Sequence, residues 1–565
     1  MMKESEECHA EQIHCRAEQG VCERPAAMSD RVVPASVLLL LSALFGLSLF
    51  WSSVVAQTAS QSTHHDILIL NGRMIDGSGT PWIKTDIAVD GDRITAIGDL
   101  SGRSADRTID ASGLYVTPGF IDTHSHASSG LTNPELSAAE PLVAQGVTTV
   151  FINPDGGGPL DLTRQQEDLR AAGPGVNVAQ FVPHGTVRVE VLGREDRAPD
   201  EKELERMKEL VRQGMEAGAF GLSTGVFYSP ASFAETDELV ELSKVAAEYE
   251  GVYQSHIRDE ADYTIGVVAA VDEVIEIAER AALPGVVTHI KALGPNVWGY
   301  SSAMVHRIEQ ARERGVQVFA DQYPYNASST SLAAALVPRW ALEGGMSAFR
   351  NRLEDDGLRG QIREQMVENL ARRGGAGRIQ LLNVRQYPDL EGRTLAWYAE
   401  ESSLEEVDAA IALLEESSPG IVSFNMNDRD VERLMRQPWT MTASDGGLVA
   451  MGQGVPHPRN YGSFPRKIKY YAVEQGVVDL AFAIRSMTHM PALVYGVHDR
   501  GMIREGAFAD LAIFDLGQLE APADFQDPHQ LAEGMVYVFV NGEAAVEDGE
   551  LTGSRSGRLL VRERD

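Results

Sequence analysis

Cysteine is almost absent from this chain of 565 residues. Its only thiols are Cys8, Cys15 and Cys22, all near the N-terminus. If the protein starts at Met28, or if the first segment is removed, the mature chain has no thiol. Disulfides are then excluded, and the stability of the fold must come from an apolar core and from bound metal.

Basic residues are also scarce. The chain has 49 Lys and Arg against 82 Asp and Glu, which gives a net charge of −33 at pH 7. Nucleic-acid binding requires concentrated positive charge to neutralise phosphates, so this composition argues against a nucleic-acid partner. The 43% hydrophobic residues and 53 glycines instead indicate a globular protein rich in turns.

Residues 1–57 differ in composition from the rest of the chain. Arg31 precedes an apolar run over residues 37–50, and small residues lead to a possible cleavage point after Ala56. This pattern predicts a cleaved secretory signal, and the alternative is an uncleaved membrane anchor over residues 35–56. We therefore expect a periplasmic or secreted protein that contacts the membrane only if this segment is retained.

Both ends of the remaining chain are rich in short predicted strands. Asn-Gly pairs at 71–72 and 541–542 follow apolar stretches and indicate tight hairpin turns. The middle of the chain lacks this pattern. We therefore expect residues 66–117 and 500–565 to form one small β-sandwich domain from both termini.

Residues 118–499 alternate apolar strands with amphipathic helices, which is typical of a parallel α/β fold. The number of predicted strands is eight, as needed to close a (β/α)8 TIM-like barrel. Residues 332–419 are charged, helical and too long for a loop, so they predict an inserted helical subdomain. The predicted strands are 114–121, 147–153, 178–184, 220–224, 252–256, 285–289, 316–323 and 440–444.

Two histidines, His124 and His126, stand at the end of the first predicted strand. Alternate side chains of a strand face the same side, so both imidazoles are expected to point into one space. At the carboxyl end of a buried strand they would form half of a metal site. An isolated pair of this kind is more often structural, so the rest of the pattern decides.

Polar residues also follow the ends of the other predicted strands. In a (β/α)8 barrel the active site lies at the carboxyl ends of the strands, so these side chains are expected to meet. Imidazoles and carboxylates suit Zn²⁺ and similar ions, and the pattern therefore predicts one or two divalent ions. The further residues are Asp155, His184, Tyr228, His256, His289, Tyr323 and Asp445.

This ordered set resembles the amidohydrolase superfamily of metal-dependent hydrolases. More narrowly, it resembles the D-aminoacylase (N-acyl-D-amino-acid deacylase) family, from about Asp66 to the C-terminus. The matching segments are Gly-Phe-Ile-Asp-Thr-His-Ser-His at 119–126, His-Gly-Thr at 184–186, Gly-Leu-Ser-Thr-Gly at 221–225, His-Ile-Arg at 256–258, His-Ile-Lys at 289–291, Tyr-Pro-Tyr at 323–325, Ser-Asp-Gly at 444–446 and His-Pro-Arg at 457–459.

The resemblance implies metal-binding roles for the histidines and aspartates. His256 and His289 would hold a tightly bound ion, and His124 and His126 a second, weaker one. Asp445 would contact the metal-bound water as the catalytic proton carrier. At the ligand position after the second strand, where the family typically has cysteine, this chain has Asp155.

A carboxylate at this position can bridge two ions, as a thiolate can, but it is a harder ligand with a much lower pKa. We therefore expect a more nearly binuclear centre or a different preferred ion. The resemblance also implies residues that hold the substrate's carboxylate, since charge-assisted hydrogen bonds orient such a group. These are Lys291, Tyr323, Ser329, Tyr228 and Arg459, with His184 either near the scissile carbonyl or packed beneath it.

The expected enzyme removes the acyl group from N-acyl-D-amino acids, small-molecule substrates, with Zn²⁺ as the expected ion. A metal ion lowers the pKa of bound water from ~16 towards ~7, and Asp445 would pass the proton to the leaving amine. A dipeptidase acting on D-amino-acid-containing dipeptides remains an alternative, as does a non-catalytic metal-binding barrel. The fourth strand, 219–225, lacks the lysine of hydantoinases, and 287–293 lacks the acid of deaminases.

Overall fold

The computed structural model describes residues 63–384 and 386–562. The predicted export signal or membrane anchor over residues 1–57 lies outside the described residues. Among the helices that the model does describe, none has the length and apolar character needed to cross a membrane.

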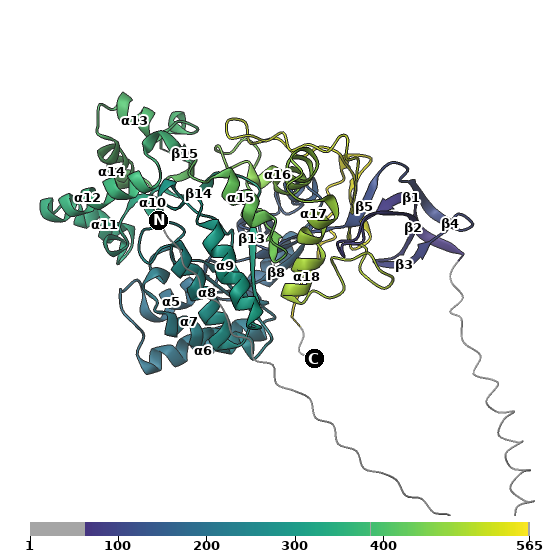
Figure 1. The fold of residues 1–565 in the computed structure, drawn as a ribbon, viewed down its shortest axis with the longest axis horizontal. Coiled ribbons are helices and arrows are strands. Elements are labelled where there is room, and N and C mark those ends of the chain that lie inside the picture. Colours follow the sequence, from purple (N-terminus) through teal and green to yellow (C-terminus); the bar gives the residue numbers. More distant parts are fainter. Residues whose placement is uncertain (1–62, 385, 563–565) are drawn as a thin grey trace, which may run out of the picture. The chain divides into compact units, whose positions relative to one another are not determined.

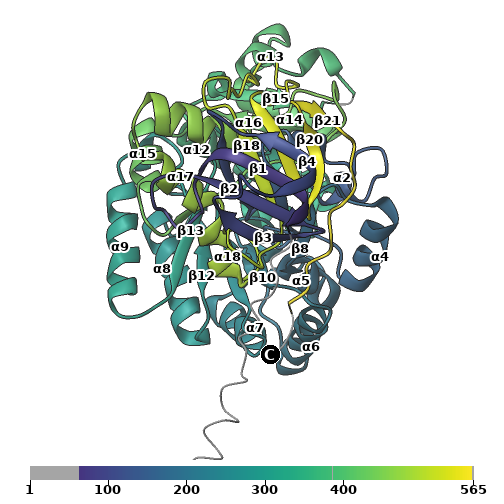
Figure 2. The same ribbon diagram turned by 90° about the vertical axis from the view of Figure 1, so that its right-hand side faces the viewer.

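The two ends of the described chain pair in one nine-stranded sheet, as Figures 1 and 2 show in purple and yellow. Its order is β21-β20-β19-β18-β5-β1-β2-β3, and β4 pairs with β1. Antiparallel pairing of β18 with β5 joins the ends. The strands are β1 (His64–Met74), β2 (Ile83–Asp90), β3 (Arg93–Gly98), β4 (Ser104–Asp110), β5 (Tyr115–Pro118), β18 (Leu511–Phe514), β19 (Met535–Val540), β20 (Glu543–Glu547) and β21 (Glu550–Leu551). The expected meeting of the termini is seen, and the sandwich form stays a prediction.

Two parallel sheets occupy the middle of the chain. The first, in the order β6-β7-β8, contains β6 (Phe120–Asp122), β7 (Val147–Ile152) and β8 (Asn177–Gln180). The second, in the order β17-β13-β12-β11-β10-β9, contains β9 (Val182–Pro183), β10 (Gly221–Gly225), β11 (Val252–His256), β12 (Gly285–Val287), β13 (Val318–Gln322) and β17 (Thr440–Thr442). Nearly all of these residues are buried, as expected where a parallel sheet is covered on both faces.

The predicted first strand over 114–121 is divided between two sheets. Its first half is β5 of the terminal sheet, and its second half is β6 of the parallel sheet. Gly119 lies between them, and a Cβ at this position would approach Thr148 to 2.3 Å. The chain can therefore pass from one sheet to the other only because this residue has no side chain.

Helices follow most of the parallel strands and cover them on the outside (Figure 1). They are α4 (Leu162–Ala172), α5 (His184–Leu192), α6 (Glu201–Glu216), α7 (Thr236–Ala247), α8 (Val267–Ala281) and α9 (Ser301–Glu313). Helix α6 begins at a capping box of Asp200 and Glu203, which satisfies its first backbone N–H groups. Apolar residues of these helices and of β10–β13 form one core cluster, which includes Val211, Val252 and Val286.

The predicted insertion has its own apolar core, which includes Phe349, Ile362 and Ile411. Its helices are α10 (Leu332–Leu336), α11 (Met346–Arg352), α12 (Asp356–Arg372), α13 (Leu395–Glu401) and α14 (Glu406–Glu416). A small antiparallel sheet joins them, made of β14 (Ser328–Ser331), β15 (Ile379–Leu382) and β16 (Gly420–Ser423). The sequence pattern does not indicate this sheet, because its strands are only four residues long and β14 is wholly polar.

Six α-helices of the described chain remain. In chain order, the first two precede β7, the third precedes β17, and the last three follow β17. They are α2 (Ser128–Leu131), α3 (Glu140–Val143), α15 (Asp428–Met435), α16 (Arg459–Arg466), α17 (Leu480–Met487) and α18 (His489–Tyr495).

Candidate metal centre and cavity

The two histidines of the His-x-His pattern lie close together, in the turn after β6 rather than in the strand itself. Their ring centroids are 5.3 Å apart. His124 is fully buried, whereas the side chain of His126 is 40% exposed. The backbone N–H of Asp445 donates to the carbonyl of His124, and that of His126 donates to Gly446. These bonds hold the turn against the loop that follows β17.

Asp155, in the loop after β7, faces all four predicted histidine ligands. Its Oδ1 lies 3.3 Å from Nε2 of His124 and 3.5 Å from Nε2 of His289. Its Oδ2 lies 3.5 Å from Nε2 of His126 and 3.7 Å from Nδ1 of His256. A single carboxylate therefore connects the two pairs of imidazoles.

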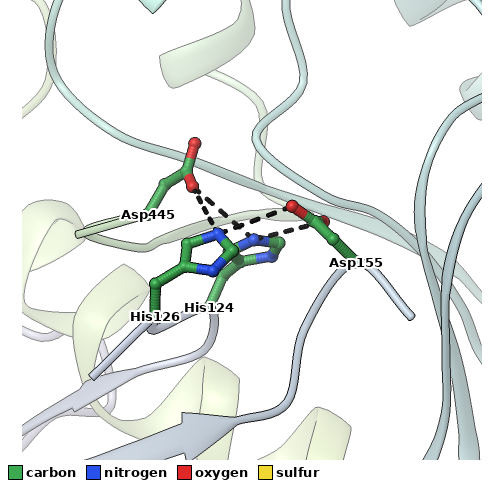
Figure 3. Close-up of side chains that lie close together, drawn as sticks. All are labelled: His124, His126, Asp155 and Asp445. Carbon is green, nitrogen blue, oxygen red and sulfur yellow. Dashed lines mark ion pairs between the residues drawn. The ribbon is translucent and has the colours of Figure 1, made fainter. Parts of the chain in front are cut away.

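Asp445 approaches the first pair of histidines from the opposite side (Figure 3). Its Oδ1 lies 3.7 Å from Nε2 of His124 and 3.2 Å from Nε2 of His126. The structure thus brings together the six predicted metal ligands, which come from loops and strand ends at the carboxyl side of β6, β7, β11, β12 and β17.

Three of these six residues have a left-handed backbone. The φ angles are 54° for Asp155, 35° for His289 and 50° for Asp445. This conformation is uncommon for residues other than glycine, and it concentrates at functional sites where the surroundings enforce it. Enforced backbone geometry at three of the converging residues favours a functional site over a chance cluster.

Several polar atoms at the centre of the cluster are buried and have no hydrogen-bond partner within residues 63–384 and 386–562. They are both ring nitrogens of His124, both ring nitrogens of His256 and Oδ1 of Asp155. Because buried polar atoms are normally hydrogen-bonded, converging unpartnered nitrogens and oxygens fit a bound cation. Two groups of donors lie within 4.8 Å, namely His124, His126, Asp155 and Asp445, and Asp155, His256 and His289. Asp155 belongs to both, so the donor set fits two bridged divalent ions.

The charge of the cluster also favours a cation. Burial lowers the pKa of His126, but hydrogen bonding to Asp155 and Asp445 outweighs it and raises this pKa to about 9. The carboxylates therefore attract positive charge to the point where the imidazoles meet.

Glu260 supports the second pair of histidines from behind. It forms a close ion pair with Lys291, and its carboxylate lies 3.1 Å from Nδ1 of His289 and 3.7 Å from Nε2 of His256. Burial raises the pKa of Glu260, but the charge of Lys291 and the two imidazoles outweigh it and hold the pKa below its usual range. Carboxylates in this position typically orient metal-binding histidines.

A cavity of ≈ 290 Å³ opens beside the cluster. Five of the six predicted substrate-binding residues line it, namely Tyr228, Lys291, Tyr323, Ser329 and Arg459. The ring of Tyr323 lies 5.6 Å from Nζ of Lys291 and 4.9 Å from Cζ of Arg459. The cavity thus offers two cations and several hydroxyl groups next to the metal ligands, an arrangement suited to a carboxylate.

His184 does not line this cavity. It starts helix α5, and its Nε2 lies 2.9 Å from Oε1 of Glu238, which also pairs with Arg188. The start of the helix turns the imidazole into this buried ion-pair cluster. The structure therefore gives no support to the predicted contact of His184 with the substrate, and it leaves the packing alternative.

The cavity lining also includes two charged residues that were not predicted from the sequence, Glu260 and Arg373. Glu260 follows His256 by four residues, a spacing that could have indicated a partner for the histidine. Arg373 comes directly after α12 in the inserted segment, where no motif marks it. Only the folding of the insertion against the parallel sheets brings it to the cavity.

Comparison with known proteins agrees with this site. The model of the amidohydrolase family matches residues 107–546. D-aminoacylase of Alcaligenes xylosoxydans xylosoxydans is 34% identical over 528 residues, which cover 89% of this chain and 99% of that protein. The similarity therefore extends over nearly the whole of both chains and is not limited to the metal motif.

Two solved structures are similar to the same extent. A D-aminoacylase with a binuclear metal centre is 33% identical, with a TM-score of 0.75 over 88% of this chain and 100% of that chain. N-acyl-D-glutamate deacylase of Bordetella bronchiseptica, in complex with zinc and a phosphonate inhibitor, is 32% identical with the same TM-score and coverage. The chain therefore belongs to the amidohydrolase family and, within it, to the D-aminoacylases.

Proposed function

We propose that this protein is a metal-dependent hydrolase that removes the acyl group from N-acyl-D-amino acids. The observation that carries the proposal is the position of Asp155 between four imidazoles, beside a cavity that contains Lys291 and Arg459. The substrates named for the relatives support the choice of an amide next to a free carboxylate.

The fold that we propose for the middle region is a closed (β/α)8 barrel. Only Phe181 separates β8 from β9, so the chain itself connects the two parallel sheets on one side. On the other side, the bonds from Asp445 to His124 and from His126 to Gly446 connect the ends of β17 and β6. The likeness to solved D-aminoacylases supports this arrangement, with the terminal sheet as a separate β-sandwich.

The proposed metal ligands form two sets that share Asp155. His124, His126 and Asp445 would hold one ion, and His256 and His289 the other. We propose Zn²⁺, because it prefers imidazole and carboxylate ligands, and a relative is known with zinc. A bound divalent ion supplies Lewis acidity and lowers the pKa of water.

The side chains of this chain would then orient the substrate and move the proton. Lys291 and Arg459, with the hydroxyl groups of Tyr228, Tyr323 and Ser329, would hold the substrate's α-carboxylate. Asp445 would accept a proton from the attacking water and pass it to the amine nitrogen as the amide bond breaks.

The proposal is tested by amine release from N-acetyl-D- and N-acetyl-L-amino acids and from short D/L dipeptides. The protein is first stripped with a chelator, and Zn²⁺ is then restored. Zinc-dependent release from N-acyl-D-amino acids is the expected result. Turnover of dipeptides alone would change the assignment to a dipeptidase, and no turnover by the metal-loaded protein would contradict a hydrolase.

We also propose, from the composition of residues 1–57, that the protein is exported. The N-terminal sequence of protein isolated from its native host tests this. A mature start shortly after Ala56 would support a cleaved signal, whereas an intact segment in the membrane fraction would support an anchor.

A further inference from the structure

Among the described residues, most buried and half-buried cations of the interior are paired with carboxylates. Arg188 pairs with Glu238, Arg258 with Glu273, Arg459 with Asp445, Arg500 with Asp510 and Lys291 with Glu260. Two arginines depart from this pattern, namely Arg373, which lines the metal cavity, and Arg339, which lines a neighbouring cavity. Within the described residues, neither Arg373 nor Arg339 has a carboxylate oxygen within 4.0 Å of its guanidinium group.

Arg373 reaches the metal cavity from the inserted segment and is 1% exposed. Its Nε donates to the hydroxyl of Tyr263 at 2.8 Å, and its Nη1 donates to the hydroxyl of Ser423 at 3.1 Å. Both partners are neutral, and in the described part of the chain Nη2 has no partner. Two hydroxyl groups hold the guanidinium in place without balancing its charge.

Arg339 lines a second cavity of ≈ 180 Å³. Its Nε and Nη2 are buried and have no hydrogen-bond partner among the residues that the structure describes. Its Cζ lies 4.1 Å from the centre of the Phe227 ring, and burial lowers its pKa. Phe227 and Tyr228 line both cavities, so this second cavity lies directly behind a wall of the first.

Both guanidinium groups lie beside the ring of Tyr263, and burial and the charge of Arg373 both lower the pKa of Arg339. Their Cζ atoms are 5.9 Å (Arg373) and 5.7 Å (Arg339) from the ring centre of Tyr263. The carboxylate of Asp259 acts on Arg339 electrostatically, but it accepts hydrogen bonds from the backbone of Ala261 at 2.9 Å and Gly266 at 3.1 Å. Asp259 therefore acts on Arg339 through its charge, from beyond the 4.0 Å of a direct ion pair.

An arginine without a paired carboxylate cannot become neutral by losing its proton, because its guanidinium stays charged at any physiological pH. Lys467, which is also buried without a carboxylate, can become neutral instead. Within the described residues, buried Arg373 and the buried Nε and Nη2 atoms of Arg339 therefore lack a directly paired carboxylate, which is costly for the folded protein unless an anion binds there. The cavities they line are the place where a ligand can supply one.

We propose that the preferred substrates are N-acyl-D-amino acids with an acidic side chain, and that Arg373 and Arg339 bind the side-chain carboxylate. The proposal rests on the proposed deacylase function, because Lys291 and Arg459 are assigned there to the α-carboxylate. The second anionic group of the substrate then extends from the metal cavity towards Phe227 and Tyr263. A neutral side chain would leave both arginines unpaired.

The first test compares the zinc-loaded protein on N-acetyl-D-glutamate, N-acetyl-D-aspartate, N-acetyl-D-glutamine and N-acetyl-D-leucine. Glutamine is the matched neutral probe, since it has the shape of glutamate without its charge. We expect kcat/KM for at least one acidic substrate to exceed that for glutamine by roughly 10- to 100-fold, as for loss of a charge-assisted hydrogen bond.

Equal or faster turnover of glutamine or leucine would overturn this proposal while leaving the deacylase function intact. If no N-acyl-D-amino acid is hydrolysed by protein with verified metal content, the proposed function itself fails. The two failures are therefore distinguishable in one experiment.

The second test uses Arg339→Gln and Arg373→Gln. We expect the ratio of kcat/KM for glutamate over glutamine to fall by roughly 10-fold or more in each variant, mainly through a higher KM for glutamate. Arg339→Lys, which keeps the charge, should restore part of the ratio. Metal content and melting temperature are measured for each variant to establish that it is folded and loaded.

The matched control is Arg372→Gln. Arg372 is the sequence neighbour of Arg373, and its Cζ lies 5.8 Å from the same Tyr263 ring, but it pairs with Asp262 and Glu368. The control should leave the glutamate-to-glutamine ratio unchanged. A proportional loss of both substrates in the Arg339 and Arg373 variants would overturn their assignment to the side-chain carboxylate.

Discussion

Nη1 of Arg459 donates a hydrogen bond to Oδ2 of Asp445 over 2.7 Å, while Oδ1 of the same carboxylate faces Nε2 of His126 at 3.2 Å. Burial raises the pKa of Asp445, but Arg459 and the nearby imidazoles outweigh it and keep this pKa below its usual range. One carboxylate oxygen of Asp445 therefore binds Arg459, and the other faces the histidine cluster. Asp445 is thereby kept ionised, which is the state in which a carboxylate can accept a proton.

Replacement of Asp445 by asparagine should abolish most of the hydrolysis. The amide side chain would have nearly the same shape but could not accept a proton, so we expect kcat to fall by about 10²- to 10⁴-fold. The measurement is the steady-state rate of Asp445→Asn at equal metal content. Asp356→Asn, on the exposed start of α12, is the control and should keep full activity. Full hydrolysis by Asp445→Asn would exclude Asp445 as the proton carrier.

Removal of Asp155 should reduce binding at both metal positions, because one carboxylate faces both pairs of histidines. We expect Asp155→Ala to lose more metal than His256→Ala, which removes a ligand from one group only. Metal per protein after dialysis is measured by elemental analysis. Asp168→Asn, on the outer side of α4, should retain the content of the unaltered protein. An unchanged metal content in Asp155→Ala would show that it is no ligand.

Chelation should destabilise the fold. A ligand that binds only the native state adds to its stability, and its removal leaves the buried atoms of His124, His256 and Asp155 without a partner. We expect the melting temperature to fall by several degrees, on the order expected for the loss of a few kcal/mol in a protein of this size. Scanning calorimetry before and after treatment with EDTA, and again after addition of Zn²⁺, checks this. An identical melting temperature in all three samples would contradict a structural contribution of the metal.

Lys467 should make stability depend on pH. It begins the π-helical segment Lys467–Glu474, and its Nζ donates to the hydroxyls of Thr442 at 2.7 Å and Ser486 at 2.8 Å. Burial lowers its pKa from 10.5 to about 7. Between these values the unfolded chain binds more protons than the native chain, so this contribution to stability rises with pH from about 7 to 10.5.

Lys467→Met removes this titration. We expect the variant to exceed the original protein in free energy of unfolding by a few kcal/mol at pH 6 to 7, and the difference to shrink as the pH rises. Urea unfolding from pH 6 to 9 measures it. Lys244→Met, an exposed position on α7, should give the same pH slope as the original protein. Parallel slopes for Lys467→Met and the original protein would refute a depressed pKa.

The cluster of candidate metal ligands was largely predictable from the sequence, because its members follow local rules. A short buried strand has a clear apolar pattern, and parallel strands present their carboxyl ends at one side, so His256 and His289 could be expected to meet. The backbone confirms this, although the strands are shorter than predicted and His124 follows its strand instead of ending it. These side chains meet because the parallel strands run in one direction. An error of one or two residues in a predicted strand end therefore does not change the prediction.

The charged groups around that centre were decided by the tertiary structure. Glu260 reaches Lys291 and His289 because two neighbouring loops meet, and His184 turns to Glu238 because a helix begins at it. No spacing in the sequence marks Arg373, since a distant insertion brings it to the cavity. The sequence by itself thus determined which residues can hold metal, through patterns that repeat within each strand. Only the packing of remote segments decided which cations line the cavity without a directly paired carboxylate, because an ion pair depends on distance in space and leaves no periodic pattern in the sequence.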